Sequence, residues 1–165
     1  MNAYETFATP LGRFTVVVDA TGAVAVAAFG ELDDIRHLTG AVEVTEAPEL
    51  TAEARRQVEA YFAGDRRNFD LTLAEPATDF QRRYRAEMAS LGYGVTTTYG
   101  ELARRLSSSA RAAGRANATN PLCIIVPCHR VIGADGSLTG YAYGIEIKRR
   151  LLEHEGALVQ AALPV

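Results

Sequence analysis

The character of the chain changes near residue 77, and this change constrains the fold more than any other feature of the sequence. Before it, short Val-rich segments are separated by Gly and Pro, which is typical of strands and turns. After it, apolar residues recur at helical spacing behind residues that can cap helices. The 165 residues are enough for one domain with a small companion. We therefore expect an α/β (α+β) protein with a first domain at 1–77 and a second at 78–165.

The first domain is expected to be a small sheet with one helix. Residues 13–19 and 23–29 flank a short turn and predict a hairpin. Residues 69–73 alternate between apolar and polar side chains like an edge strand, and the Pro-containing segment 74–77 is typical of a linker.

The helix of this domain is predicted over residues 49–62. Leu50, Ala54, Val58 and Phe62 recur at intervals of four, which indicates one apolar face. Gly at position 64 is suited to end the helix.

The second domain is expected to be mainly helical. Thr78 and Gln81 have the spacing of a capping box and open a helix to about residue 91. A second box opens a short helix at 98–106, and a third helix is predicted over 110–118. These two short helices on either side of a tight turn have the pattern of a helix-turn-helix, although the pattern taken alone is more often an ordinary helical hairpin. A last helix is predicted over 145–155.

Charge divides the chain in the same way. Residues 1–78 hold six Arg and thirteen Asp or Glu, a net charge of −7. Residues 79–165 hold eleven Lys or Arg and seven Asp or Glu, a net charge of +4. Seven Arg lie between positions 82 and 115, which suggests that the second domain meets a polyanion. Ordinary solvated helix faces would give the same composition, so charge alone leaves the two interpretations open.

Neither a membrane span nor a secretory signal is indicated. No apolar run is long enough to cross a bilayer, and the N-terminus lacks the basic start and apolar run of a signal peptide. We expect a cytoplasmic protein that does not bind membranes and whose thiols are reduced.

The chain contains only two cysteines, Cys123 and Cys128. In an extended segment their odd separation would direct them to opposite faces, which disfavours a disulfide between them. Two cysteines and three histidines show no paired ligand spacing, so neither a metal site nor a cofactor is expected. A special role for Cys128 would then be nucleophilic.

His129 follows Cys128 directly and is a candidate base for it. A thiol reacts as its thiolate and needs a neighbour that takes its proton. Adjacent side chains of an extended segment diverge, so a water between sulfur and imidazole would have to relay the proton. The imidazole needs a carboxylate to fix its tautomer, and Glu155 is the favoured candidate. A Cys-His pair taken alone is more often an inert buried cysteine beside a surface histidine.

The residues around this pair carry a resemblance that outweighs the inert interpretation. Residues 124–133, IIVPCHRVIG, closely resemble the acceptor-site signature of the O6-alkylguanine-DNA alkyltransferases, also called methylated-DNA–protein-cysteine methyltransferases. Further blocks resemble the same family, at 61–64, 69–70, 78–81, 98–103, 110–114, 120–121 and 151–156. The ordered blocks cover roughly residues 4 to 157 and are highly specific.

The resemblance implies a role for each catalytic position. Cys128 would accept the alkyl group in one displacement, and His129 would act as base through a water. Glu155 would hold His129. Tyr99 would help to protonate the leaving base, and Asn120 would brace the turn that carries Cys128.

The resemblance also implies how DNA is bound. Arg111 would enter the base stack in place of a flipped-out nucleotide, because a thiolate cannot reach the reacting carbon inside a stacked duplex. The helix would lie in the minor groove. The remaining DNA contacts expected are Ala110, Ala112, Ala113, Gly114, Arg115 and Arg130. The first domain would have the family's ribonuclease-H-like α/β fold, and its zinc site, present in some relatives, should be absent.

Three residues are expected to line the alkyl pocket: Pro127, Tyr141 and Tyr143. Tyr143 stands where the family often has a smaller residue, so it would narrow the pocket or fold away from it. The thioether formed on the acceptor is stable, so each molecule would act once and without a cofactor. Its substrate would be duplex DNA carrying O6-alkylguanine, with O4-alkylthymine as a second candidate. We expect a monomer.

Two other functions compete with this one. A DNA-binding regulator or damage sensor without chemistry is disfavoured because family sensors lack the acceptor cysteine. A cysteine hydrolase would need an oxyanion hole and a second base, and the sequence offers neither a Gly-rich loop nor that base. One departure concerns the turn at 107–109, which makes the helix-turn-helix shorter than is usual in the family.

Overall fold

The computed structural model describes residues 1–138 and 140–157, which form two compact units. The first unit comprises Met1–Glu75 and Pro121–Ile125, and the second comprises Pro76–Asn120 and the chain from Val126 onward. The break at Glu75 lies close to the boundary expected near residue 77. The segment Pro121–Ile125 returns to the first unit, which a boundary drawn along the sequence does not include. Residues 158–165 of the expected second domain lie outside the described residues.

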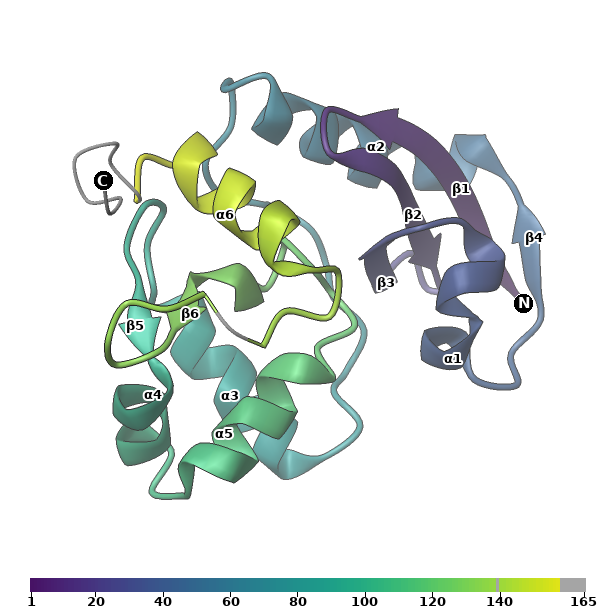
Figure 1. The fold of residues 1–165 in the computed structure, drawn as a ribbon. Helices are drawn as coiled ribbons and strands as arrows, with labels where there is room; N and C mark the ends of the chain where they lie inside the picture. Colours follow the sequence, from purple (N-terminus) through teal and green to yellow (C-terminus); the bar gives the residue numbers. More distant parts are fainter. Residues whose placement is uncertain (139, 158–165) are drawn as a thin grey trace. The chain divides into compact units, whose positions relative to one another are not determined.

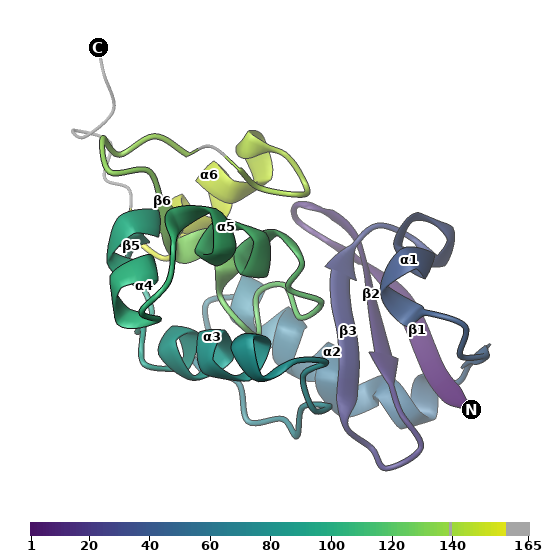
Figure 2. The same ribbon diagram turned by 90° about the horizontal axis from the view of Figure 1, so that it is seen from below.

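The first unit is built on a four-stranded sheet with the order β3-β2-β1-β4 (Figures 1 and 2). Its strands are β1 (Asn2–Thr9), β2 (Gly12–Val18), β3 (Val24–Phe29) and β4 (Val44–Glu46). β1, β2 and β3 are antiparallel neighbours, and β4 runs parallel to β1. The predicted hairpin is β2 and β3. Strand β1 was not predicted, although burial alternates along it in the period of two that a strand requires.

Helix α2 (Pro48–Phe62) covers one face of this sheet (Figure 2). It buries Ala54, Val58 and Tyr61, whereas Leu50 is 65% exposed. The predicted apolar face was therefore wrong at its first position. A strict interval of four advances about 40° beyond a full turn at each step, so Leu50 rotates away from the face that Val58 buries.

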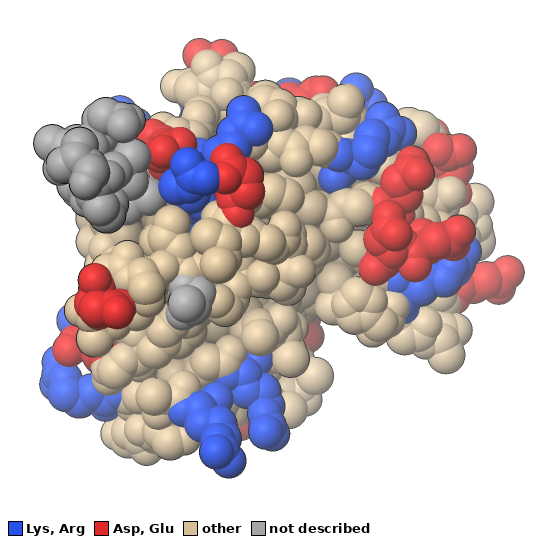
Figure 3. Space-filling model, in the orientation of Figure 1, with Lys and Arg blue, Asp and Glu red and all other residues tan. Residues whose placement is uncertain are grey.

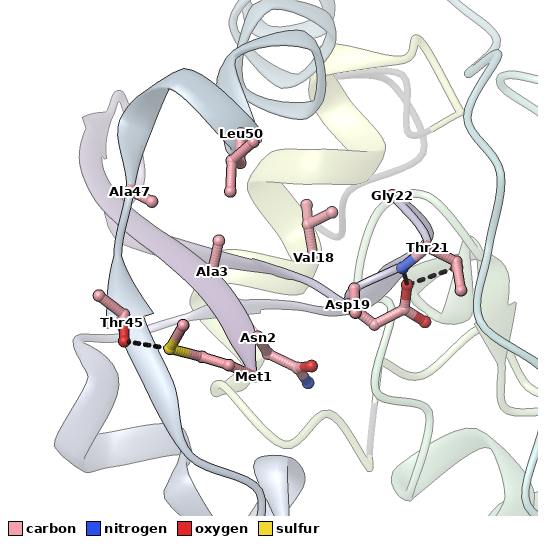
Figure 4. A pocket seen from close by; sticks show the side chains of 11 residues that line it. Met1, Asn2, Ala3, Val18, Asp19, Thr21, Gly22, Thr45, Ala47 and Leu50 are labelled. Carbon is pink, nitrogen blue, oxygen red and sulfur yellow. Dashed lines mark hydrogen bonds between the residues drawn. The ribbon is translucent and has the colours of Figure 1, made fainter.

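Leu50 instead lines a hollow of about 370 Å³ at the end of the sheet (Figure 4). Val18 and Ala3 contribute apolar side chains to its wall. Asp19 accepts hydrogen bonds from the backbone and hydroxyl of Thr21 at its edge, at 2.9 and 2.6 Å.

The predicted edge strand at 69–73 is absent from the described structure, where only Leu73 forms an isolated bridge with Val24. The side chain of Gln57 accepts a hydrogen bond from the backbone N–H of Asp70 and donates one to its carbonyl, at 2.8 and 2.9 Å. Gln57 thus satisfies the backbone of Asp70 in place of a neighbouring strand, while the backbone of Thr72 and Ala74 bonds that of Val24.

The segment Pro121–Ile125 lies beside β3. The N–H of Ala27 donates to the carbonyl of Pro121, and the N–H of Cys123 donates to the carbonyl of Ala27, at 2.8 and 2.7 Å. The buried Ile124 has a φ of +74°, a strained conformation for a β-branched residue. The chain therefore bends sharply just before the predicted acceptor cysteine.

The second unit is mainly helical, as expected (Figure 1). Its longer elements are α3 (Asp79–Ala89), α4 (Tyr99–Arg105), α5 (Ala110–Ala118) and α6 (Ile145–His154). The predicted helices at 79–91 and 145–155 end two residues and one residue earlier than expected. Two short strands, β5 (Thr97–Thr98) and β6 (Val131–Ile132), pair in parallel. Two shorter helices complete the first unit, η1 (Leu32–Ile35) and α1 (Arg36–Thr39).

Side-chain caps fix where the helices of the helix-turn-helix and its neighbour begin. Thr78, Thr98 and Ser109 accept hydrogen bonds from the backbone N–H groups of α3, α4 and α5, at 3.0, 3.1 and 3.1 Å. Gln81 donates to Thr119 instead of returning to its own cap, and Glu101 pairs with Arg side chains of α4. The two predicted capping boxes thus supply their first hydrogen bond only. None of the described helices is long and apolar enough to span a bilayer.

Candidate active site

The predicted acceptor lies on a single turn of 3-10 helix, η2 (Cys128–Arg130). The segment is therefore the turn that the bracing role of Asn120 implied, and the extended geometry used to compare Cys128 with His129 does not apply to it. The N–H of Arg130 donates to the carbonyl of Pro127 at 2.9 Å, and the N–H of Cys128 donates to the carbonyl of Val126 at 2.7 Å. Cys128 is 4% exposed and, like Cys123, is present as a thiol. The turn places three buried polar or reactive side chains in succession.

His129 is fully buried and bonded to Glu155. Its Nε2 lies 2.7 Å from Oε2 of Glu155 at the C-cap of α6. An ionised carboxylate can only accept, so Nε2 carries the proton and Nδ1 keeps a lone pair. Among the described residues nothing hydrogen-bonds Nδ1. Burial lowers the pKa of His129, which favours the neutral imidazole. The side chain is therefore arranged as a base with Nδ1 as its acceptor atom.

Arg130 has a different place from the one predicted. Its side chain is 7% exposed, and its guanidinium binds Glu155 through Nε and Nη2 at 2.8 and 3.0 Å. Its Nη1 donates to the carbonyl of Leu91 at 2.8 Å. These contacts commit the guanidinium to the interior, so the structure gives no support to a DNA contact by this residue.

Two asparagines hold the turn. Asn120 donates from Nδ2 to the carbonyl of Val126 at 2.9 Å, a contact that fits the bracing role expected of it. Asn117 donates to the carbonyl of Cys128 itself at 3.1 Å and accepts from the hydroxyl of Tyr84 at 2.6 Å. Asn117 was not predicted as a site residue. The sequence did hold an indication, because an Asn inside a helix is unfavourable unless its side chain makes specific hydrogen bonds.

Tyr99 and Lys148 face each other beside the turn. Tyr99 is half-buried at the start of α4, and burial raises its pKa, which keeps the phenol protonated. Lys148 is fully buried on α6, and its Nζ lies 5.6 Å from the centre of the Tyr99 ring and 6.0 Å from that of Tyr141. Burial lowers the pKa of Lys148 to about 8, against the opposing effect of a charge on Cys128. Lys148 was predicted to lie on the last helix but not to belong to the site.

The predicted alkyl-pocket residues all belong to the second unit. The rings of Tyr141 and Tyr143 meet edge to face, with centroids 5.5 Å apart. Both are half-buried, whereas Pro127 is buried. Tyr143 therefore has its ring against the first tyrosine of the loop.

Helix α5 presents the predicted DNA-binding residues. Arg111 and Arg115 are exposed, and with Ala112 they line a hollow of about 440 Å³ beside α3. Ala110 is exposed and Gly114 is half-buried. On the face drawn in Figure 3, basic side chains gather over the part of the second unit formed by α4 and α5.

Ala113 differs from its neighbours on α5. It is fully buried and faces the core of the unit, so the prediction that it contacts DNA is corrected. Positions 110, 111 and 114 lie on another face of the helix, as the period of 3.6 residues requires.

A helix-turn-helix beside a buried thiol, with a histidine base held by a carboxylate, defines a DNA-binding protein equipped for nucleophilic chemistry. The sequence model described as the 6-O-methylguanine DNA methyltransferase DNA binding domain matches residues 79–157, and that of the ribonuclease-like domain matches residues 2–74. The chain belongs to the 6-O-methylguanine DNA methyltransferase family.

Relatives and solved structures agree over almost the whole chain. Methylated-DNA–protein-cysteine methyltransferase of Methanosarcina acetivorans is 41% identical over 93% of this chain and 98% of its own length. The protein of the same name from Mycobacterium tuberculosis is 41% identical over 97% and 96%. The crystal structure of Mycobacterium tuberculosis OGT in complex with DNA matches with a TM-score of 0.82 at 41% identity, covering 93% of this chain and 92% of that one.

Proposed function

We propose that this protein repairs alkylated DNA by moving the alkyl group of O6-alkylguanine onto Cys128. The observation that carries the proposal is the buried turn in which the thiol directly precedes a histidine whose Nε2 is bonded to Glu155 at 2.7 Å. This arrangement makes a base of the type that activates a thiol. Relatives named methylated-DNA–protein-cysteine methyltransferases support the choice of reaction.

The proposed reaction is one displacement at carbon. The thiol proton passes to Nδ1 of His129 through a water, and Cys128 Sγ forms a bond to the alkyl carbon. The bond from that carbon to guanine O6 breaks, and its electron pair stays on the base. Tyr99 donates a proton to the leaving base and regains one from the imidazolium of His129 through water, so that the proton lost by the thiol ends on the guanine. Arg111 fills the place of the flipped nucleotide, and Tyr143, whose ring meets that of Tyr141, either narrows the alkyl pocket or folds away from it.

The product explains why the protein should act once. A thioether does not hydrolyse under the conditions of a cell, and none of the described residues is arranged to remove the alkyl group. Duplex DNA is the proposed partner, a choice supported by the crystal structure of the Mycobacterium tuberculosis protein in complex with DNA. We propose that the protein acts as a monomer. We also propose that it acts in the reducing cytosol, because the reaction consumes a free thiol.

The test counts lesions repaired per protein molecule. A duplex oligonucleotide carrying O6-methylguanine is supplied in excess, and the remaining lesion is measured by chromatography of the digested DNA. One lesion lost per protein is expected, with none lost for Cys128→Ser and one for Cys123→Ser. Binding without loss of the lesion would instead identify a damage sensor. Many lesions lost per molecule would identify a turning-over enzyme such as a hydrolase.

A further inference from the structure

The carboxylate of Glu155 accepts hydrogen bonds from other donors besides His129. Its Oε1 accepts from Arg130 Nε at 2.8 Å and from the N–H of Gly94 at 3.1 Å. Its Oε2 accepts from Arg130 Nη2 at 3.0 Å and pairs with His129 Nε2 at 2.7 Å. Each oxygen therefore has two partners, and the side chain of Glu155 is fully buried.

Arg130 is itself held in a fixed orientation. Its Nη1 donates to the carbonyl of Leu91, and its guanidinium carbon lies 5.8 Å from the centre of the Tyr93 ring. The hydroxyl of Tyr93 donates to the carbonyl of His154, next to Glu155 in the chain, at 3.3 Å. The planar fork of an arginine matches a carboxylate in a way that the point charge of a lysine cannot.

Gly94 brings the loop before β5 against the end of α6. Its φ is +76°, a conformation that favours glycine. A Cβ at this position would lie 2.9 Å from the backbone carbonyl oxygen of Glu155, closer than such contacts allow. A side chain here would push the loop away and remove the hydrogen bond to Oε1.

We propose that Arg130 and Gly94 are positioning residues that keep Glu155 ionised and oriented, so that His129 stays a neutral base. The inference rests on the proposed function, because it concerns the proton acceptor for Cys128. A buried carboxylate without a balancing cation either takes up a proton or draws one onto the imidazole. Both outcomes remove the free base. In both, the pH range in which His129 cannot accept a proton extends higher than in the intact site.

The charges around His129 act in opposite directions. Arg130 and Lys148 disfavour the imidazolium, as burial does, whereas Glu155 favours it. A thiolate on Cys128 would also favour the imidazolium. Arg130 is the cation bonded directly to Glu155, so its removal shifts this balance furthest toward a protonated histidine.

The experiment measures the pH dependence of single-turnover methyl transfer from an O6-methylguanine duplex to Cys128. In Arg130→Met the acid limb of the profile should move up by about one pH unit, a tenfold loss on the acid side. The rate should recover at high pH. Arg130→Lys should shift less, since it keeps the charge and loses the fork. The matched control is Arg149→Met, a partly exposed arginine of α6 paired with Glu146, whose profile should overlay the wild type.

Two further variants keep the test decisive if Arg130→Met folds poorly. Gly94→Ala should move the acid limb in the same direction. Arg130→Lys should cause no further shift in a Glu155→Gln background, where no carboxylate needs balancing. A rate lowered equally at every pH in these variants would show a purely structural role and overturn the inference. Absence of methyl transfer in the wild type would overturn the proposed function instead.

Discussion

Three ionisable side chains are central to the proposed reaction of Cys128: the thiol itself, His129 and Lys148. The histidine is kept neutral by burial, and the lysine is a buried cation whose charge a thiolate would stabilise. The sequence suggested the first two residues from their adjacency and the third only as a member of a helix.

The pH dependence of transfer should follow the lowered pKa of His129. Because burial disfavours the imidazolium, the base stays available below the ordinary histidine value of 6.5. The rate of single-turnover methyl transfer should therefore be flat through neutral pH and fall only below about pH 6.5. An acid limb centred at pH 7 or above would contradict a desolvated histidine.

Replacing Lys148 should make the thiol a weaker acid. An opposite charge nearby typically shifts a pKa by about one unit or more. Lys148→Met should thus raise the pKa of Cys128 and slow its alkylation by iodoacetamide about tenfold at neutral pH. Lys148→Arg keeps the positive charge, so its alkylation rate should fall less. Arg150→Met, an exposed change on the same helix, serves as control. Equal alkylation rates in Lys148→Met and the wild type would remove Lys148 from the site.

At the scale of elements, the starts of the helices could be predicted from local spacing, whereas most contacts between elements could not. Thr78 and Thr98 cap their helices as the spacing indicated, because a cap is a local interaction. The 3-10 turn at Cys128 could not be derived from local spacing, because it depends on hydrogen bonds from Asn117 and Asn120. Arg130 was assigned to DNA for the same reason, because its partner Glu155 is distant in the sequence.

Helix α5 is the element on which the prediction for DNA recognition rests. Its exposed Arg111 is proposed to occupy the space left by a flipped base. Arg111→Ala should then slow repair of O6-methylguanine in duplex DNA at least tenfold, and leave the reaction with the free alkylated base almost unchanged. Both rates are measured as methyl transfer to the protein. An equal loss on both substrates would show that Arg111 supports the fold or the chemistry instead.

At the scale of the whole molecule, charge is divided between the two halves of the chain, with net values of −7 and +4. If the basic half carries DNA binding, affinity should fall linearly with salt on logarithmic axes, because bound phosphates release counterions. Arg115→Met should lower the slope by about one for a single lost phosphate contact. Arg36→Met, an exposed change in the acidic half, should leave the slope unchanged. A change in slope for Arg36→Met but not for Arg115→Met would place DNA binding on the acidic half and contradict the prediction.

The most direct test of alkyl transfer to Cys128 is the mass of the protein after reaction. The protein is incubated with a duplex oligonucleotide carrying O6-methylguanine, and the intact chain and its peptides are then weighed. One added methyl group is expected. Cys123 and Cys128 lie in the same peptide, so fragmentation of that peptide should place the methyl group on Cys128 and leave Cys123 unmodified. An unmodified protein, or a methyl group on any other residue, would contradict the assignment of Cys128 as the acceptor.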